Sequence, residues 1–274
     1  MLLHANKLLS TTSDTARLDV ELLLAFVLNE NRTYLFTWPE KKITEKQNEH
    51  FSDLLSRRIN GEPIAYIVGK QEFWSMPLKV TPDTLIPRPE TELLVELALQ
   101  QISTDTKLNI LDLGTGSGAI ALAIAKERSQ CAVTGIDQSK QALIIAEENA
   151  QNLAINNVHF QHSHWFRELT PGQQYDVIIS NPPYIASHDP HLSEGDVHFE
   201  PDSALTSGYD GLDDIREIAD EARQFLLPDG WLFMEHGYDQ STTITELLTS
   251  LGYKNIKDHN DLANLPRVIA AQYN

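Results

Sequence analysis

The sequence predicts an α/β protein in which a sheet is covered by helices, with a small helical domain in front of it. From Pro89 onward, short apolar strands alternate with helical segments, and this alternation is typical of α/β sheets. Before residue 70, apolar residues recur at helical spacing. We therefore expect a helical domain over residues 1–70, a β-hairpin linker over 71–88 and an α/β domain over 89–274.

Two helices support the helical domain. One face of the first carries Leu18, Leu22, Ala25 and Phe26. The second follows Thr44-Glu45-Lys46-Gln47, which has the spacing of a capping box, and it stops at Gly61. Between Phe73 and Pro87, apolar residues are separated by polar residues and prolines, a pattern that favours a hairpin or an extended linker.

The α/β domain is expected to begin with a helix at about residues 89–102. Short apolar runs indicate buried strands at 109–113, 132–137, 158–160, 175–180 and 231–235. Further helices are expected at about 119–126, 139–152 and 212–226.

Composition excludes several classes of protein. No run approaches the roughly 18 apolar residues that a membrane helix needs, and the N-terminus has no export signal. A single cysteine, Cys131, suits a reducing compartment, so we expect a cytoplasmic protein. The net charge of −18 argues against tight binding to nucleic acid and favours a protein partner, although the acidity also has the simpler role of solubility.

The first chemical motif is a glycine-rich turn, Asp112-Leu113-Gly114-Thr115-Gly116-Ser117-Gly118, between a strand and a helix. Glycines let the backbone turn sharply and approach a ligand at the strand's carboxyl end, where α/β folds bind cofactors. The third glycine follows the second by two residues, whereas the dinucleotide fingerprint has three. A turn with only a structural role is the alternative.

Asp137 ends the next strand, 21 residues after Gly116. A carboxylate at this position can accept hydrogen bonds from both ribose hydroxyls of an adenosine-containing cofactor. The alternative is that it caps the helix starting near Ser139.

The strongest signal is Asn181-Pro182-Pro183-Tyr184, directly after the strand that ends at Ser180. Consecutive prolines fix the backbone, so the Asn181 side chain and the Pro182 carbonyl can be held rigidly as two acceptors for one NH₂ group. Tyr184 offers a ring face to a flat amide or base. Acceptors aimed at the hydrogens of a planar nitrogen favour the pyramidal, more nucleophilic geometry of a transition state. A rigid proline turn is the structural alternative.

With these residues in view, the chain resembles the HemK/PrmC family of release factor glutamine methyltransferases over nearly its full length. Further segments carry the resemblance: Arg17-Leu18-Asp19-Val20-Glu21-Leu22-Leu23-Leu24, Gly61-Glu62-Pro63-Ile64-Ala65-Tyr66-Ile67-Val68-Gly69, Phe73-Trp74, Leu85-Ile86-Pro87-Arg88-Pro89-Glu90-Thr91-Glu92, Phe199-Glu200-Pro201 and Asp210-Gly211-Leu212. The resemblance implies a Rossmann-like class I methyltransferase domain with seven strands, and S-adenosylmethionine as the cofactor.

The resemblance also implies the site residues. Those expected around the cofactor are Gly114, Thr115, Gly116, Ser117, Gly118, Asp137, Trp165 and Asn181. Asn181, Pro182, Pro183 and Tyr184 are expected to hold the substrate, with Asn181, Pro182 and Tyr184 as the catalytic residues. His164 stands where the family usually has an acidic or amide residue before Trp-Phe, which leaves a contact to the adenine open. Trp165 has core packing as its simpler role.

The implied reaction methylates the glutamine of the Gly-Gly-Gln motif in class I release factors, with the helical domain binding a second part of the substrate. Three rivals stay open: a ribosomal-protein glutamine methyltransferase, an adenine amino-methyltransferase, and a cofactor-binding subunit without activity. No metal is expected, because methyl transfer from a sulfonium needs no Lewis acid and His159 and His162 would face opposite sides of a strand.

Overall fold

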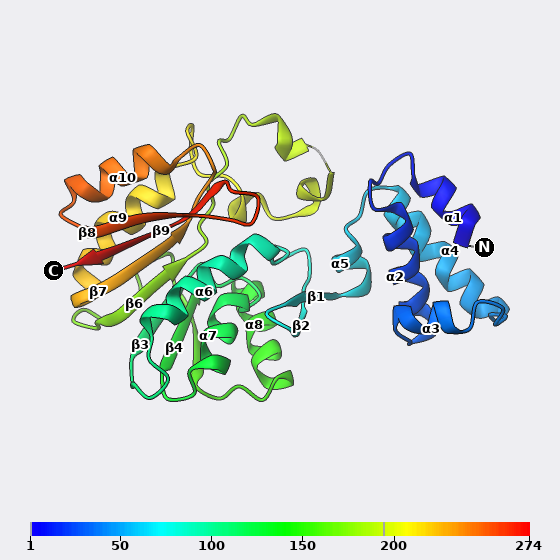
Figure 1. The fold of residues 1–274 in the computed structure, drawn as a ribbon, viewed down its shortest axis with the longest axis horizontal. Helices are drawn as coiled ribbons and strands as arrows, with labels where there is room; N and C mark the ends of the chain where they lie inside the picture. The colour runs from blue at the N-terminus through cyan, green and yellow to red at the C-terminus, as the bar shows by residue number, and fades with distance from the viewer. Residues whose placement is uncertain (1, 194) are drawn as a thin grey trace. The chain divides into compact units, whose positions relative to one another are not determined.

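The protein's structure is a computed structural model that describes residues 2–193 and 195–274 (Figure 1). The chain forms two units, one of Met1–Lys70 with His191–Phe199 and one of Gln71–Pro190 with Glu200–Asn274. The chain therefore leaves the second unit after Pro190 and returns to it at Glu200. The division into domains at residues 70 and 88 stays a prediction.

The first unit is built from helices. They are α1 (Leu2–Leu9), α2 (Ala16–Leu28), α3 (Arg32–Thr37), α4 (Glu45–Ile59), α5 (Ile64–Val68) and the short 3-10 helix Gly195–Phe199. The capping box at the start of α4 is present, since the Thr44 hydroxyl accepts from the Gln47 amide and the Gln47 side chain accepts from the Thr44 amide.

The predicted apolar face of α2 is wrong at two of its four residues, while Ala25 is buried and Leu22 is half-buried. Leu18 and Phe26 are 38% and 42% exposed, whereas Val20 and Leu23 are buried. The buried stripe also contains Asp19, a position that a hydrophobic pattern assigns to solvent. Asp19 is tolerated there because Arg58 of α4 donates to its carboxylate at 2.8 Å, and a buried charge needs such a partner.

The hairpin joins strands β1 (Lys70–Phe73) and β2 (Met76–Lys79). Its two turn residues, Trp74 and Ser75, have φ values of 51° and 53°, as a type I′ turn requires. Phe73 and Met76 are buried in the core of the second unit.

The main sheet has seven strands in the order β5-β4-β3-β6-β7-β9-β8. Their bounds are β3 (Asn109–Leu113), β4 (Ala132–Asp137), β5 (Val158–His162), β6 (Tyr175–Ser180), β7 (Leu226–Glu235), β8 (Lys254–Asn260) and β9 (Pro266–Tyr273). All pairs are parallel except those made by β9. The five predicted strands are confirmed, and β8 and β9 are additional to them.

Helices cover both faces of this sheet (Figure 1). The 3-10 turn Pro89–Thr91 leads into α6 (Glu92–Gln101), which packs with α7 (Ala119–Glu127) and α8 (Lys140–Asn152) on one face. On the other face lie α9 (Asp213–Phe225) and α10 (Ser241–Ser250), and α10 had not been predicted. Ile110 points to the first layer and Leu111 to the second, so β3 is apolar on both sides. Within the described residues, no helix is both long enough and apolar enough to cross a membrane.

Candidate active site

The strand order reverses between β3 and β6, and this is the point at which open α/β sheets bind ligands. Leu113 is in register with Ile136 and with Ser180, and Ser180 with Met234. The next residue on each chain therefore lies in the same row. This row contains Asp137, Gly114, Asn181 and Glu235, from four neighbouring strands.

A pocket opens at this edge of the sheet and holds about 640 Å³ of space, part of it open to solvent. It is lined by Asp83, Thr84, Leu85, Gly114, Gly116, Asp137, Gln138, Ser139, Ala142, Ser163, His164, Trp165, Asn181, Pro183, Pro201, Ser203 and Ala204. All these residues belong to the second unit.

The glycine turn approaches the pocket with its backbone. Gly114 and Gly116 have φ values of 70° and 55°, so both adopt the left-handed conformation that glycine allows. A Cβ on Gly114 would lie 3.3 Å from the Trp165 ring, whereas one on Gly116 would meet no atom within 4 Å. Gly116 therefore leaves open space beside the pocket, which a side chain would reduce.

Asp112 lies behind the turn and is 1% exposed. Its Oδ2 accepts from the Thr115 hydroxyl at 2.6 Å and from the Ala121 amide at 3.1 Å. Its Oδ1 has no hydrogen-bond partner among the described residues. Burial raises the pKa of this carboxyl from its ordinary value of 3.8 to about 7, against the lowering effect of the two hydrogen bonds.

Asp137 is fixed by two backbone amides. Its Oδ2 accepts from Gly116 at 2.9 Å and its Oδ1 from Ser139 at 2.8 Å. Burial raises the pKa of Asp137, while these two hydrogen bonds lower it. Ser139 itself caps α8 by accepting from the Ala142 amide, so Asp137 does not replace it as the capping residue. Each carboxylate oxygen retains a lone pair for a ligand.

Trp165 combines two of the roles considered for it. The ring is 7% exposed and packs in the core beneath α9, and it also lines the pocket. Its indole nitrogen donates to Asp214 at 3.0 Å, which fixes the plane of the ring. His164 lines the pocket beside it, and its Nδ1 has no hydrogen-bond partner among the described residues.

The Asn-Pro-Pro-Tyr segment is held from several sides. The Asn181 side chain donates from Nδ2 to the Thr91 hydroxyl at 3.3 Å. The Tyr184 hydroxyl donates to Glu235 at 3.1 Å, and the Tyr184 carbonyl accepts from Gln240 at 2.9 Å. Gly211 packs on the same carbonyl so closely that a Cβ would lie 2.3 Å from it. The segment is therefore rigid on both its side-chain and its backbone side.

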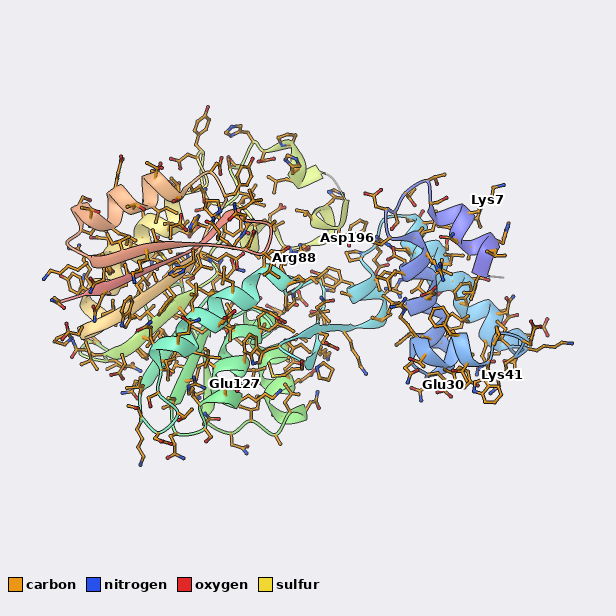
Figure 2. The ribbon with its side chains drawn as sticks, in the orientation of Figure 1. Lys7, Glu30, Lys41, Arg88, Glu127 and Asp196 are labelled. Atoms are coloured by element: carbon orange, nitrogen blue, oxygen red, sulfur yellow. The ribbon has the colours of Figure 1, made fainter. Side chains whose placement is uncertain are left out.

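An ion pair with one buried partner supports another part of the pocket lining. Arg88, labelled in Figure 2, pairs with Glu200, whose side chain is fully buried. The Ile86 amide also donates to Glu200 at 3.2 Å. Glu200 thereby ties the segment that contains Leu85 to the segment that contains Pro201, and both line the pocket.

Comparison with known proteins agrees with this geometry. Residues 1–69 match the PrmC N-terminal domain, and residues 104–272 match a methyltransferase domain family. The release factor glutamine methyltransferase of Pseudomonas aeruginosa is 52% identical over 261 residues, covering 95% of this chain and 94% of that protein. The enzyme of the same name from Vibrio cholerae is 52% identical and covers 95% and 91%. The chain belongs to the release factor glutamine methyltransferase family.

The solved structures show the fold. A methyltransferase from Pyrococcus furiosus superposes with a TM-score of 0.56, covering 81% of this chain and 98% of that chain at 19% identity. The Rossmann-like class I methyltransferase fold and its small helical region, predicted from the sequence, are confirmed for this family member.

The predicted site residues fall into two groups. Around the pocket the structure brings together Gly114, Gly116, Asp137, Trp165, Asn181 and Pro183. Thr115, Ser117, Gly118, Pro182 and Tyr184 lie next to these in sequence but do not line it. Thr115 binds Asp112, and the Ser117 carbonyl accepts from Asn149. The roles assigned to both groups stay predictions.

Sequence reasoning missed three residues that contact the Asn-Pro-Pro-Tyr segment, namely Thr91, Glu235 and Gln240. In the sequence, Thr91 lies in a segment that contributes only to the family resemblance. Glu235 is the last residue of a predicted strand, the same kind of position that had singled out Asp137. Glu235 could therefore have been found by asking which polar groups end neighbouring strands, whereas Thr91 lies in a 3-10 turn and could not.

Within the described part of the chain, no group of three His, Cys, Asp or Glu side chains is placed to hold a metal ion. The expected independence from metal stays a prediction.

Proposed function

We propose that this protein methylates the side-chain amide nitrogen of the glutamine in the Gly-Gly-Gln motif of class I peptide-chain release factors, with S-adenosylmethionine as the methyl donor. The observation that carries the proposal is the identity of 52% to release factor glutamine methyltransferases over 95% of the chain. The rigid Asn181 beside the pocket supports the same reaction.

The pocket fits an adenosine-containing cofactor. Gly116 leaves open space along its backbone, and the carboxylate of Asp137 is fixed with lone pairs to spare for the two ribose hydroxyls. Trp165 offers an apolar wall, and His164 lines the pocket beside it. When bound, the cofactor supplies an activated methyl group on a positively charged sulfur.

The chain's own residues position the nitrogen that receives the methyl group. Because Nδ2 of Asn181 is turned to Thr91, the oxygen of the same amide points away from Thr91 and can accept from the substrate NH₂. The Pro182 carbonyl is the second acceptor, and the Tyr184 ring lies against the flat amide. These preorganised acceptors stabilise the pyramidal nitrogen of the transition state. No strong base is required, because the nitrogen becomes acidic once it carries the methyl group.

The helical unit is proposed to bind a second part of the release factor. Its match to the PrmC N-terminal domain supports a task shared with the relatives. Remote contacts of this kind raise efficiency toward the whole protein without touching the reacting atoms. We expect the enzyme to act in the cytoplasm, on protein and not on nucleic acid.

The test is mass spectrometry of a purified release factor incubated with the enzyme and labelled cofactor. One methyl group is expected on the Gly-Gly-Gln glutamine. Asn181→Ala is expected to slow the transfer by about 10²–10³, the cost of losing a preorganised polar group at a developing charge. Labelling of a large-subunit ribosomal protein or of adenine in DNA or RNA, with the release factor unlabelled, would overturn the proposal.

A further inference from the structure

Glu235 is a buried carboxyl that lies one strand away from Asn181 in the row of strand ends. It is 1% exposed, and its Oε1 accepts from the Tyr184 hydroxyl at 3.1 Å. Its Oε2 has no hydrogen-bond partner among the described residues. Glu235 forms no ion pair within the described residues, although the charge of Arg267 acts on it, and it contacts the Asn-Pro-Pro-Tyr segment through Tyr184.

Thr91 connects Glu235 to Asn181. It is 3% exposed, and its hydroxyl oxygen accepts from Asn181 Nδ2 at 3.3 Å. The same hydroxyl interacts with the carboxyl group of Glu235. A threonine hydroxyl has one hydrogen to donate, and a carboxylate takes that hydrogen as an acceptor. The oxygen of Thr91 is then left to accept, and only the NH₂ end of the Asn181 amide can satisfy it.

This arrangement decides which end of the Asn181 amide faces the substrate. An asparagine side chain can rotate by half a turn and exchange its oxygen and its NH₂ at little steric cost. In the rotated form, NH₂ would face the substrate NH₂, two donors would meet, and no transfer geometry would form. The hydrogen bond from Asn181 to Thr91 stabilises the unrotated form against this one, and the interaction of Thr91 with Glu235 adds to the preference.

We propose that Thr91 is a positioning residue for methyl transfer, which holds the Asn181 amide with its oxygen toward the substrate, and that Glu235 orients Thr91 and steadies Tyr184. The inference rests on the proposed function, because Asn181 is its target. A purely structural role for this buried polar cluster is the alternative, and the two differ in whether the effect of Thr91 passes through Asn181.

The experiment is a double-mutant cycle on the full-length enzyme, with a purified release factor and S-adenosylmethionine both saturating. Thr91→Val keeps the shape and removes the hydroxyl, and it is expected to lower kcat about tenfold, the size of one lost hydrogen bond. In an Asn181→Ala background the same change is expected to alter kcat by less than about twofold. Thr91→Ser is expected to restore most of the wild-type kcat, and cofactor affinity by calorimetry should stay within about twofold in the Thr91 variants that keep Asn181.

Two further variants complete the design. Thr249→Val removes a hydroxyl from the exposed face of α10 and is the matched control, with unchanged kcat. Thr91→Ala is a second hydroxyl-free variant in case the valine impairs folding. An equal loss in both backgrounds, or a serine variant as slow as valine, would overturn the proposal. Glu235→Gln with wild-type kcat would remove the part given to Glu235. A wild-type enzyme that leaves the release factor unmethylated overturns the proposed function instead.

Discussion

The two units of this protein bury their carboxylates in different ways. In the helical unit, Asp19 is paired with Arg58, and Glu21 accepts from Arg17 and Arg32. The hydrogen bond from Arg32, opposed by burial, holds the pKa of Glu21 below its ordinary value.

At the edge of the sheet the situation is reversed. Asp112 and Glu235 form no ion pair within the described residues, and each has an oxygen without a partner. Burial raises the pKa of both groups. A paired buried charge fixes one packing arrangement, whereas an unpaired buried carboxyl is costly and collects where a ligand binds. In this chain, the buried carboxyls with an arginine partner are therefore expected to have a structural role. Those without a partner are expected to act near the ligand site.

The largest expected effect comes from breaking the buried ion pair of the helical unit. Arg58→Met leaves Asp19 buried without its cation and should lower the free energy of unfolding by about 3–5 kcal/mol, the usual cost of breaking a buried pair. The neighbouring substitution Arg57→Met is the matched control. Arg57 pairs with Glu62 in a partly exposed position, so the loss should stay below about 1 kcal/mol. Urea unfolding measures both.

A second-site change sharpens this test. Asp19→Leu combined with Arg58→Met should recover most of the loss, because an apolar pair of similar volume replaces two buried charges. If Arg58→Met proves as mild as Arg57→Met, the ion pair of the helical unit does not stabilise it.

Arg58 also donates to Asp196 at 2.7 Å. Deleting residues 1–70 would therefore leave His191–Phe199 without the rest of its unit, which makes point variants the cleaner test.

The next effect concerns cofactor affinity at the sheet edge. Asp137→Asn removes the charge and also places an NH₂ against one of the two backbone amides that the carboxylate now satisfies. Losing one charge-assisted hydrogen bond costs about 1.5–3 kcal/mol, so calorimetry should show S-adenosylmethionine binding weakened at least about tenfold. Asp176→Asn is the control. Asp176 accepts from the Asn109 amide at the start of β6, at the opposite end of the strands. Equal affinities for the two variants would remove the ribose role of Asp137.

The sequence predicts the half of the sheet that carries the site better than the other half. Strands β3, β4 and β6 are apolar on both faces, which a single sequence displays directly. By contrast, β8 reads Lys-Asn-Ile-Lys-Asp-His-Asn and is an edge strand, so only its pairing with β9 makes it a strand. Such pairing depends on distant residues, and a local pattern does not contain it.

The same limit explains the site. Gly114, Asp137 and Asn181 each end a strand and could be predicted from motif and spacing. Thr91 could not, because its contact with Asn181 depends on how the 3-10 turn before α6 lies against the end of β6. The partly wrong face of α2 has a similar cause, since Asp19 is buried against an arginine 39 residues further along the chain.

A further expected effect is a pH dependence of stability at Asp112. The folded protein holds the pKa of this carboxyl at about 7, while the unfolded chain has the ordinary value of 3.8. Below the lower value both states are protonated and Asp112 carries no penalty. As the pH rises between the two values, the unfolded state ionises while the folded state keeps its proton. The folded state therefore loses stability, by at most about 1.4 kcal/mol per pH unit, until the loss levels off above about pH 7.

Asp112→Asn cannot ionise, so it should remove this loss. Its free energy of unfolding relative to wild type should rise from pH 4 toward pH 7, a window of about three pH units, and then stay constant. Urea unfolding of both proteins across this range measures the difference, and other titrating groups such as Glu235 cancel because both proteins contain them. Asp105→Asn, in an exposed loop, should show no such trend. Parallel stability curves for Asp112→Asn and wild type would mean that Asp112 is ionised in the folded state throughout. The unpaired carboxyls of the sheet edge would then need stabilising partners of their own, as Arg58 is for Asp19 inside the helical unit.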